Sequence, residues 1–380
     1  MQSAHKQIIS FGPPPVNPYS TAVKAGGLIY LSGTLAHDPG APSDAGSETR
    51  RTLERMRDVL LAAGSSLDDV VAVLVYLTSA SDFQAMNQAY RAFWPGDPPT
   101  RTTVITELVV PDARVEISMV AVPRGRERVV LLPDGWKRSP NPYSYGIRSG
   151  STVFLSGLVA RRGSDNTFVG GDVRVQTRTI MENAGELLAT AGLTHRDVVS
   201  SKIYLTRAAD FAAMNEVYRE FFPDAPPARA TVQSGLAGPE AVVEITFVAS
   251  SGSRSAIGTP PSGLPLSPAI RAGQHLFVSG MLGNSPETAG DVAAQTRATL
   301  SRIDATLRDA GSSRADVVDA LVYITDAASF GAMNGEYRAF FGADFPARAT
   351  VVTPLVAADG LVEIMVTAVV PDSGASGSRA

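Results

Sequence analysis

The sequence predicts an α+β protein made of three tandem copies of one domain. The segment VVAVLVYLTSASDFQAMNQAYRAFW at 70–94 recurs, with substitutions, at 198–222 and at 317–341. The chain has 380 residues, about three times the length of a common single domain. Because the repeated unit spans roughly 120 residues, each copy is a domain and not a solenoid module of about 20–50 residues.

Polar residues keep their spacing from copy to copy. In every copy an arginine precedes a glutamate by 15 residues, and an asparagine and a Ser-Gly pair recur upstream. The recurring residues are Ser32, Ser156 and Ser279, Asn87, Asn215 and Asn334, Arg101, Arg229 and Arg348, and Glu116, Glu244 and Glu363. The second copy has four more residues between its serine and asparagine than the first, which we place in the loop at 161–168.

Composition changes suggest the domain boundaries. We expect domains at 1–124, 128–250 and 263–371 and a flexible tail at 372–380. The arginines at 124, 126 and 128 suggest a solvated linker, and SSGSRSAIGTPPSG at 250–263 suggests a second one.

Within a copy the hydrophobic pattern predicts the order β-β-α-β-α-β-β. Apolar residues with a helical period and runs typical of strands predict, in the first copy, a strand at 28–32, a helix at 48–63, a strand at 70–78, a helix from 82 to 94, and strands at 102–108 and 114–122. Asp82 is the expected N-cap of the second helix. Two helices on one face of a sheet leave the other face uncovered, and the sister copies are available to cover it.

Composition excludes several classes of function. The formal net charge is −4, so no basic field favours nucleic acid as a partner. Cysteine is absent, and the four histidines occupy non-equivalent positions in the repeat, so a site shared by the copies contains neither residue. We therefore expect no metal and no cofactor. No apolar run approaches the ~20 residues of a membrane span, and we expect a cytoplasmic protein without a membrane partner.

The arginine and the glutamate are the residues of greatest chemical interest. A guanidinium at the start of a strand can hold a carboxylate with two parallel hydrogen bonds. Glu116 lies inside the apolar Val-Glu-Ile stretch, where a carboxylate is costly unless it is paired or solvated in a cleft. A purely structural explanation is that the arginine and glutamate of one copy pair with each other. The serine as a turn former and the asparagine as a loop cap are further structural alternatives.

The motifs identify a family resemblance. They are Asn-Pro-Tyr-Ser at 17–20 and 141–144, Leu-Ser-Gly at 31–33 and 155–157, Gly-Gly-Asp-Val at 170–173, and Pro-Ala-Arg-Ala-Thr at 227–231 and 346–350. Each copy resembles the RidA/YjgF family of reactive intermediate deaminases, also described as endoribonuclease L-PSP. The resemblance implies a chorismate-mutase-like fold, ligand clefts between subunits and, for three fused copies, an intrachain pseudo-trimer that is monomeric.

The same resemblance implies an activity and roles for residues. The activity is hydrolysis of enamine or imine intermediates, such as 2-aminoacrylate and 2-iminopropanoate, to 2-keto acids and ammonia, so the expected partner is a small carboxylated imine. Copy by copy, it implies catalytic roles for Tyr19, Tyr143, Glu116 and Glu244 and substrate binding by Arg101, Arg229, Ser32, Ser156, Gly33, Gly157, Asn87 and Asn215. The third copy has Leu266 in place of the tyrosine, so a degenerate third cleft is expected around Arg348, Glu363, Ser279 and Asn334.

Other functions remain open at this point. One alternative is a non-catalytic protein that binds small carboxylates or serves as a scaffold. Another is a hydrolase or lyase for a larger carboxylated substrate, because the loop at 36–47 differs between copies. Ribonuclease activity is disfavoured by the net charge and by the lack of a recurring histidine.

Overall fold

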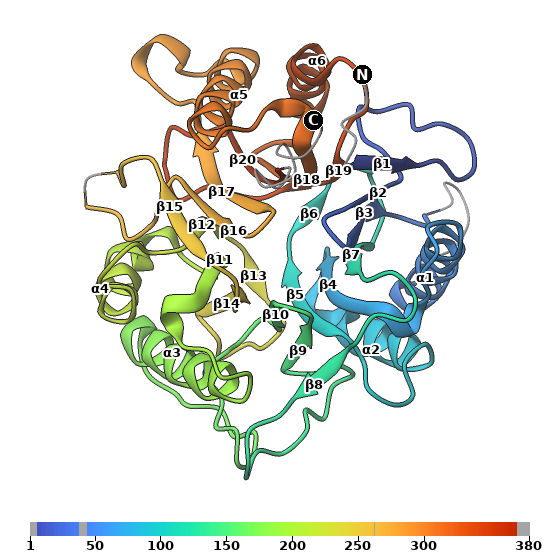
Figure 1. Ribbon diagram of the computed structural model, residues 1–380, viewed down its shortest axis with the longest axis vertical. Helices are drawn as coiled ribbons and strands as arrows, with labels where there is room; N and C mark the ends of the chain where they lie inside the picture. The colour runs from blue at the N-terminus through green and yellow to red at the C-terminus, as the bar shows by residue number, and fades with distance from the viewer. Residues whose placement is uncertain (1–5, 38–43, 262, 371–380) are drawn as a thin grey trace, which may run out of the picture.

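Figure 1 shows a computed structural model of the chain, which describes residues 6–37, 44–261 and 263–370. Three units of similar architecture surround a common centre, with the helices outside and the strands toward the centre (Figure 1). Each unit is a mixed sheet with two α-helices on its outer face, which confirms the α+β prediction. No helix among the described residues combines the length and the apolar character needed to cross a bilayer.

The three domains repeat one order of elements. The first contains β1 (Lys6–Ile9), β2 (Ala22–Ala25), β3 (Leu28–Thr34), α1 (Ala45–Ala62), β4 (Val70–Leu77), α2 (Phe83–Arg91), β5 (Thr100–Ile105), β6 (Glu107–Leu108) and β7 (Val115–Ala121). The second contains β8 (Val129–Leu131), β9 (Gly146–Ser149), β10 (Thr152–Leu155), α3 (Val173–Ala189), β11 (Val198–Leu205), α4 (Phe211–Phe221), β12 (Ala228–Gln233), β13 (Gly235–Leu236) and β14 (Val243–Ser250). The third contains β15 (Arg254–Ile257), β16 (Ala269–Ala272), β17 (His275–Leu282), α5 (Val292–Asp309), β18 (Val317–Ile324), α6 (Phe330–Phe341), β19 (Ala347–Val352) and β20 (Val362–Val369).

The sheets exchange short segments around the ring. The first sheet has the order β1-β2-β3-β7-β4-β5-β13, so its last strand comes from the second domain. The third sheet ends likewise in β6 of the first domain, paired through Val351 with Leu108. An isolated bridge joins Val232 of β12 to Leu355 of the third domain. Each domain therefore extends the sheet of another, and the three exchanges close the ring.

A basic side chain near the first strand of each domain reinforces these interfaces. The Lys6 ammonium donates to the carbonyls of Val317 and Asp344 at 2.6 and 2.7 Å. In the same way Arg128 bonds Val70 and Asp97, and Arg254 bonds Val198 and Ala225. Arg128 therefore docks onto the first domain, and only Arg124 and Arg126 form the solvated linker that was predicted.

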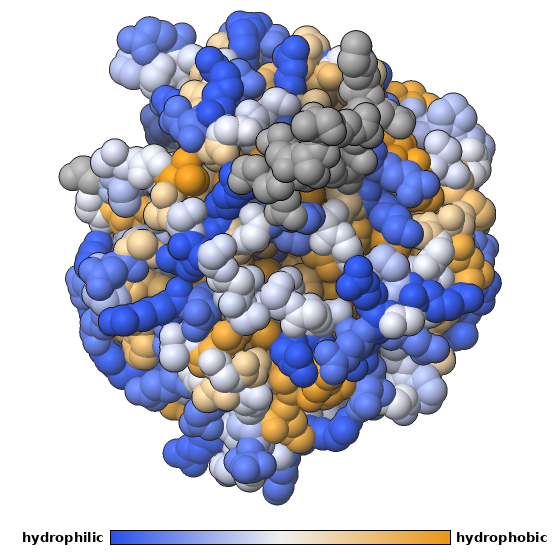
Figure 2. Space-filling view, viewed as in Figure 1, coloured by the Kyte–Doolittle hydropathy of each residue, from blue (hydrophilic) through white to orange (hydrophobic). Residues whose placement is uncertain are grey.

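Strand periodicity divides the apolar residues between two kinds of core. In β7 the alternating residues Val115, Ile117, Met119 and Ala121 pack against α1 and α2, as predicted. The opposite faces of the sheets meet one another at the centre, where Tyr76, Tyr204 and Tyr323 are fully buried. The rim over α3 and α4 in Figure 2 is largely hydrophilic. Among the described residues the exposed large apolar side chains are scattered: Phe11, Val16, Leu61 and Val175.

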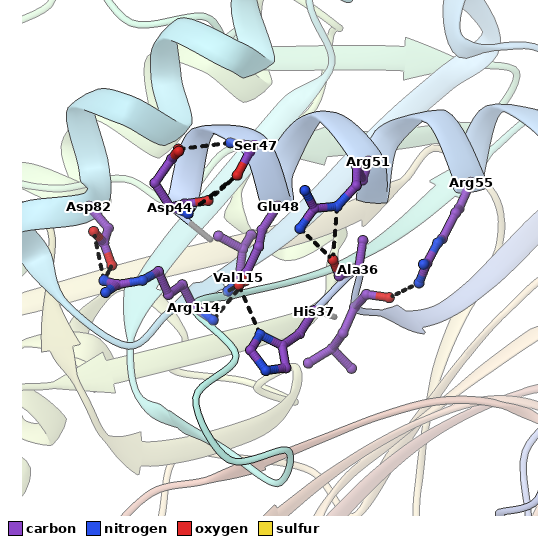
Figure 3. A network of polar contacts seen from close by, with 11 residues as sticks. Ala36, His37, Asp44, Ser47, Glu48, Arg51, Arg55, Asp82, Arg114 and Val115 are labelled. Carbon is purple, nitrogen blue, oxygen red and sulfur yellow. Dashed lines mark hydrogen bonds and ion pairs between the residues drawn. The ribbon is translucent and has the colours of Figure 1, made fainter. Parts of the chain in front are cut away.

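A buried carboxylate ties α1 to the sheet in the first domain (Figure 3). Glu48 is inaccessible to solvent and accepts hydrogen bonds from the backbone N–H groups of Arg114 and Val115, at 2.8 and 3.3 Å. His37 Nδ1 lies 3.1 Å from the same carboxylate. Gln176 and Gln295 occupy the equivalent positions and accept one such bond each, from Val242 and Leu361.

Two sequence expectations need adjustment, and two others fall on residues that the structure does not describe. Asp82 precedes α2 but does not cap it with its side chain, which instead bonds Arg114 at 3.1 Å (Figure 3). The predicted linker at 250–263 contains β15, which pairs with β16, so the third sheet begins at Arg254 and not after 263. The predicted tail at 372–380, and residues 38–43 of the variable loop at 36–47, lie outside the described residues.

Candidate active sites between the domains

Each recurring arginine lies at the boundary with another domain. There a serine hydroxyl of that domain accepts a hydrogen bond from the backbone N–H of the arginine. Arg101 N donates to Ser156 Oγ at 2.9 Å, Arg229 N to Ser279 Oγ at 2.8 Å, and Arg348 N to Ser32 Oγ at 2.8 Å. Each serine hydroxyl also donates its own proton to a backbone carbonyl: that of Ser144, Ser267 or Ser20. The serines therefore position the arginine strands across the interface, as their hydroxyl protons are already used.

These contacts define three clefts, each named by the domains that form it. The 1/2 cleft brings Arg101 and Asn87 together with Tyr143, Ser156, Gly157 and Glu244. The 2/3 cleft brings Arg229 and Asn215 together with Ser279, Gly280 and Glu363, beside the chain that carries Leu266. The 3/1 cleft brings Arg348 and Asn334 together with Tyr19, Ser32, Gly33 and Glu116.

The residues of the expected third cleft are therefore divided between two clefts, Arg348 and Asn334 in the 3/1 cleft and Ser279 and Glu363 in the 2/3 cleft. Arg348 lies in a cleft with Tyr19 and Glu116, and Glu363 lies opposite Arg229. The arginine whose cleft lacks tyrosine is Arg229, not Arg348. The reason is topological. In each domain the strand that carries the arginine lies near one edge of the sheet and contacts one neighbouring domain. The tyrosine and the glutamate of the same domain contact the other neighbouring domain.

Aromatic rings from the second helix of each domain surround the guanidinium. The Arg101 carbon Cζ lies 4.9 Å from the centre of the Tyr90 ring, 5.8 Å from Phe83 and 5.6 Å from Tyr143 across the interface. Arg348 has the same arrangement with Tyr337, Phe330 and Tyr19 at 4.7, 5.8 and 5.9 Å. Tyr90 and Tyr337 also belong to the hydrophobic cores of their domains. A recurring Tyr–Arg spacing of 11 residues, as in Tyr90 and Arg101, was the available signal.

The opposite wall of each cleft carries the buried glutamate. Burial raises the pKa of Glu116, Glu244 and Glu363 to about 8 in each case, and the facing arginine and a backbone hydrogen bond from Thr350, Thr103 or Thr231 oppose this shift. A carboxylic acid with such a pKa is protonated at neutral pH and able to exchange its proton. Burial also raises the pKa of Tyr19 and Tyr143, so their hydroxyls remain protonated.

The glycine of each Ser-Gly pair leaves room for that carboxyl group. A Cβ at Gly157 would overlap Oε1 of Glu244, and Gly33 and Gly280 stand in the same relation to Glu116 and Glu363. A side chain here would displace the glutamate from its cleft. The glycines therefore shape the site and offer no side chain to a ligand.

The arginine and glutamate do not neutralise each other. Within the described part of the chain no ion pair within 4.0 Å joins any of the three arginines to a glutamate, so the structural alternative of a simple pair is wrong. Arg348 Nη1 and Arg229 Nε are buried and have no hydrogen-bond partner among these residues. Orphaned buried donors are costly unless a ligand or water supplies an acceptor.

Asparagine contacts distinguish the 2/3 cleft from the other two. Asn87 Nδ2 donates to Asn141 Oδ1 and Asn334 Nδ2 to Asn17 Oδ1, both at 3.3 Å. The third domain has Leu264 where Asn17 and Asn141 stand. Without that partner, Asn215 Oδ1 accepts from Arg229 Nη1 at 2.7 Å. Asn215 therefore accepts from a guanidinium nitrogen, Nη1, whose counterpart in Arg348 of the 3/1 cleft has no partner among the described residues.

The 1/2 cleft adjoins additional space. A hollow of about 410 Å³ lies beside Tyr143 and is bordered by Arg91, Trp94 and Arg138. On the other side of Tyr143 the inserted loop of the second domain folds back through a bridge between Arg161 and Phe168. The four additional residues thus lie next to this cleft, in the loop where they were predicted.

The family model described as endoribonuclease L-PSP matches the chain three times, at residues 11–123, 137–251 and 258–370. The chain belongs to this family. The three matches follow the three domains of Figure 1, and together they cover most of the chain. Among the described residues of this L-PSP protein, no group of three histidine, aspartate or glutamate side chains is arranged to hold a metal ion.

Solved structures of similar proteins match one L-PSP domain at a time. NMB1025 from Neisseria meningitidis, a YjgF family protein, is 37% identical over 32% of this chain and 98% of its own length, with a TM-score of 0.29. Rv2704 from Mycobacterium tuberculosis, of the YjgF/YER057c/UK114 family, is 35% identical over 31% of this chain and its whole length, also with a TM-score of 0.29. YyfA from Yersinia pestis, of the Rid family, is 26% identical over 33% of this chain and 99% of its own, with a TM-score of 0.31.

Proposed function

We propose that the chain hydrolyses enamine and imine derivatives of 2-amino acids, of the 2-aminoacrylate and 2-iminopropanoate type, to 2-keto acids and ammonia. The 1/2 and 3/1 clefts are the catalytic ones. The observation that carries the proposal is that each of these two clefts places a buried arginine opposite a protonated glutamic acid and a tyrosine.

In this proposal the arginine binds the substrate. Arg101 or Arg348 holds the carboxylate through charge-assisted hydrogen bonds, and its aromatic surroundings keep the guanidinium in place and exclude water. The imine carbon then lies between the arginine and the glutamic acid. Because an imine is already electrophilic, orientation and a positioned water suffice, and no cysteine or histidine nucleophile is needed.

The glutamic acid moves the protons. Glu244 or Glu116 protonates the imine nitrogen, and water attacks the carbon, forming the C–O bond while the C=N π pair moves to nitrogen. The carboxylate removes a proton from the added water and returns it to the amine. The C–N bond then breaks, ammonia leaves, and the hydroxyl proton returns to the glutamate as the keto group forms. Tyr143 or Tyr19 donates a hydrogen bond to the oxygen. An enamine enters this sequence after protonation at its carbon.

The test is ammonia and 2-keto-acid release from 2-iminopropanoate generated in situ by an amino-acid oxidase, with semicarbazide as the competing trap. We expect wild-type protein to accelerate release and Arg101→Ala/Arg348→Ala to abolish the acceleration. Arg229→Ala is the matched control, because it removes an equally buried arginine from the cleft without tyrosine. No acceleration by wild type would overturn the proposal, and equal loss in both variants would overturn the assignment of clefts.

The hollow of about 410 Å³ beside Tyr143 favours a second candidate, a larger carboxylated substrate in the 1/2 cleft. The variant Arg348→Ala retains the 1/2 cleft. In that case we expect this variant to hydrolyse imines with longer side chains faster than 2-iminopropanoate. Arg101→Ala, which retains the 3/1 cleft, keeps the preference for the small substrate. Identical preferences in the two variants would contradict this candidate.

A further inference from the structure

A cavity of about 110 Å³ lies at the centre of the ring, where the inner faces of the three sheets meet. It is distinct from the three clefts, as none of the recurring arginines or glutamates lines it. Its wall includes matching positions of β4, β11 and β18. Toward the ends of these strands the centre is filled by Tyr76, Tyr204 and Tyr323, so that side is closed.

In the wall of this cavity, two positions that are uncharged in the other copies carry a charged residue. Lys202 of β11 occupies the position of Leu74 in β4 and Leu321 in β18. Asp319 of β18 occupies the position of Ala72 and Ser200. Three identical chains around such a centre would bring three like charges together. The fused chain instead presents one ammonium and one carboxylate to the same small space.

The protein gives neither charge an ionic partner within 4.0 Å in its described part, although the Asp319 carboxylate accepts a backbone hydrogen bond from Ala320. In the described residues Lys202 forms no hydrogen bond or ion pair, and no ion pair within 4.0 Å joins it to Asp319. The charges still influence each other: burial lowers the pKa of Lys202 and raises that of Asp319 to about 6, and each charge opposes the other's shift. Lys202 and Asp319 are half-buried and both line the cavity. Because a charge that faces a small cavity without a close ionic partner is unfavourable, this pair indicates a ligand between its members.

Two further polar groups border the cavity without partners. The Tyr30 hydroxyl is buried, has no hydrogen-bond partner among the described residues, and is close enough to Asp319 for that charge to affect its pKa. Phe154 and Phe277 stand at its position in the other copies. His275 Nε2 is likewise buried without a partner in this part of the chain. Tyr30 therefore adds a polar group near Asp319, and His275 adds one where the cavity meets the outer hollow.

An entrance is available at the opposite end from the tyrosines. A hollow of about 690 Å³ lies between the hairpin tips at 26–27, 149–151 and 272–274. Leu28, Thr152 and His275 line both this hollow and the cavity. A small molecule entering between the hairpins therefore passes these side chains to reach Lys202 and Asp319.

We propose that the central cavity binds a small zwitterion of the α-amino-acid class, its carboxylate on Lys202, its ammonium on Asp319 and its short side chain against Leu74 and Leu321. A cavity of about 150 Å³ accommodates benzene, so the smaller space of about 110 Å³, which adjoins the hollow between the hairpins, limits the ligand to the smallest members of this class. An ion of one sign would leave one of the two charges unpaired. This inference is independent of the proposed deaminase activity.

The experiment is isothermal titration calorimetry of the full chain with L-alanine, propanoate and ethylammonium. We expect L-alanine to bind at one site per chain that does not depend on the clefts, so that Arg101→Ala/Arg348→Ala retains it. Propanoate and ethylammonium, which each carry one of the two charges, bind at least tenfold more weakly. Absence of L-alanine binding to the wild type, or its loss in the arginine variant, would overturn the proposal.

The key variant is Lys202→Leu/Asp319→Ala, which introduces residues that other copies carry at these positions. It removes both charges together, so neither is left buried alone, and we expect it to fold, keep the deaminase rate and lose L-alanine binding. Leu74→Met is the matched control in the same layer and retains binding. Unchanged binding in the double variant, or an empty cavity in crystals of the wild type saturated with L-alanine, would overturn the proposal.

Discussion

The 3/1 and 2/3 clefts contain the same arginine and glutamate but differ in what surrounds the guanidinium. In the 3/1 cleft Arg348 faces Tyr19, and Asn334 is held away by Asn17. In the 2/3 cleft Leu264 and Leu266 replace that asparagine and tyrosine, and Asn215 turns to Arg229. Substitutions in the third copy therefore affect the arginine of the second copy. In such a ring, a degenerate repeat alters a cleft whose arginine belongs to a different domain.

The largest effect on kcat/KM in this comparison is expected from replacing the arginines of the clefts. Removing Arg101 and Arg348 together is expected to lower kcat/KM about 100-fold or more, because each charge-assisted hydrogen bond to a buried carboxylate contributes about 1.5–3 kcal/mol. Arg229→Ala is expected to change kcat/KM less than twofold. Steady-state rates at equal folded concentration check both values. A large loss in Arg229→Ala would show that the 2/3 cleft is the active one.

The pH dependence of the rate separates the glutamates by role. Burial raises the pKa of Glu244 and Glu116 to about 8, so the acid form that the reaction needs is present below that pH and lost above it. We expect kcat/KM to fall about tenfold per pH unit above pH 8, as for any reaction that requires one protonated group. Glu244→Gln/Glu116→Gln removes this dependence together with most of the activity. A rate that rises through pH 8 would contradict the acid role.

Glu363 provides the matched control, because burial raises its pKa to about 8 as well but its cleft lacks the tyrosine. A raised pKa in the folded state stabilises the fold at low pH, and this stabilisation is lost as the pH rises from about 4.5 to about 8. Glu363→Gln is expected to make the free energy of unfolding less dependent on pH in that window while the rate profile stays unchanged. A shifted rate profile would place Glu363 in catalysis.

A smaller effect, on the stability of the fold, is expected from substitution of the buried residue in the first turn of the first helix of each copy. Glu48→Ala leaves the N–H groups of Arg114 and Val115 without an acceptor and is expected to cost about 2–4 kcal/mol in the free energy of unfolding. Glu48→Gln, which introduces the residue of the other two copies, is expected to cost less than about 1 kcal/mol. Urea unfolding measures both. A cost for glutamine as large as for alanine would mean that the charge beside His37 is required.

The smallest effect is expected when the asparagine and the tyrosine that the 2/3 cleft lacks are introduced into the third copy. Leu264→Asn/Leu266→Tyr is expected to release Asn215 from Arg229 and add a third working cleft, which raises kcat per chain to about one and a half times the wild-type value if all clefts act equally. Leu264→Asn/Leu266→Phe lacks the hydroxyl and serves as the control. Adding Arg229→Ala to the restored variant is expected to remove the gain. A gain that survives this change would have to come from elsewhere.

Much of the fold could be predicted from the repeats and their periodicity. The alternation in β7 placed Ile117 and Met119 on the core face and left Glu116 on the other, and the structure confirms both. The three-domain organisation followed from copied segments such as 70–94. In contrast, β15 lies within a Gly/Ser/Pro-rich segment with no strand periodicity, since its pairing with β16 is what makes it a strand.

The composition of the clefts could be predicted only in part. The sequence identified Arg348 and Glu363 as members of one repeat, but the distance between them depends on which neighbour each surface faces, and that is a property of the assembled ring. Tyr90 belongs to the core and also contacts Arg101, and helical periodicity alone does not distinguish a ring that packs only on leucine from one that also packs on a guanidinium. Lys202 and Asp319 carried no sequence signal beyond their mismatch with the other copies.

The closed exchange of β6, β13 and the segment at Leu355 has a consequence for behaviour on dilution. Every cleft is assembled from parts of a single polypeptide, so its formation is a unimolecular event with an effective concentration set by the linkers rather than by the amount of protein present. Separate chains held by the same contacts would dissociate on sufficient dilution and lose their clefts. Here specific activity is expected to stay constant down to the lowest concentration at which the chain remains folded.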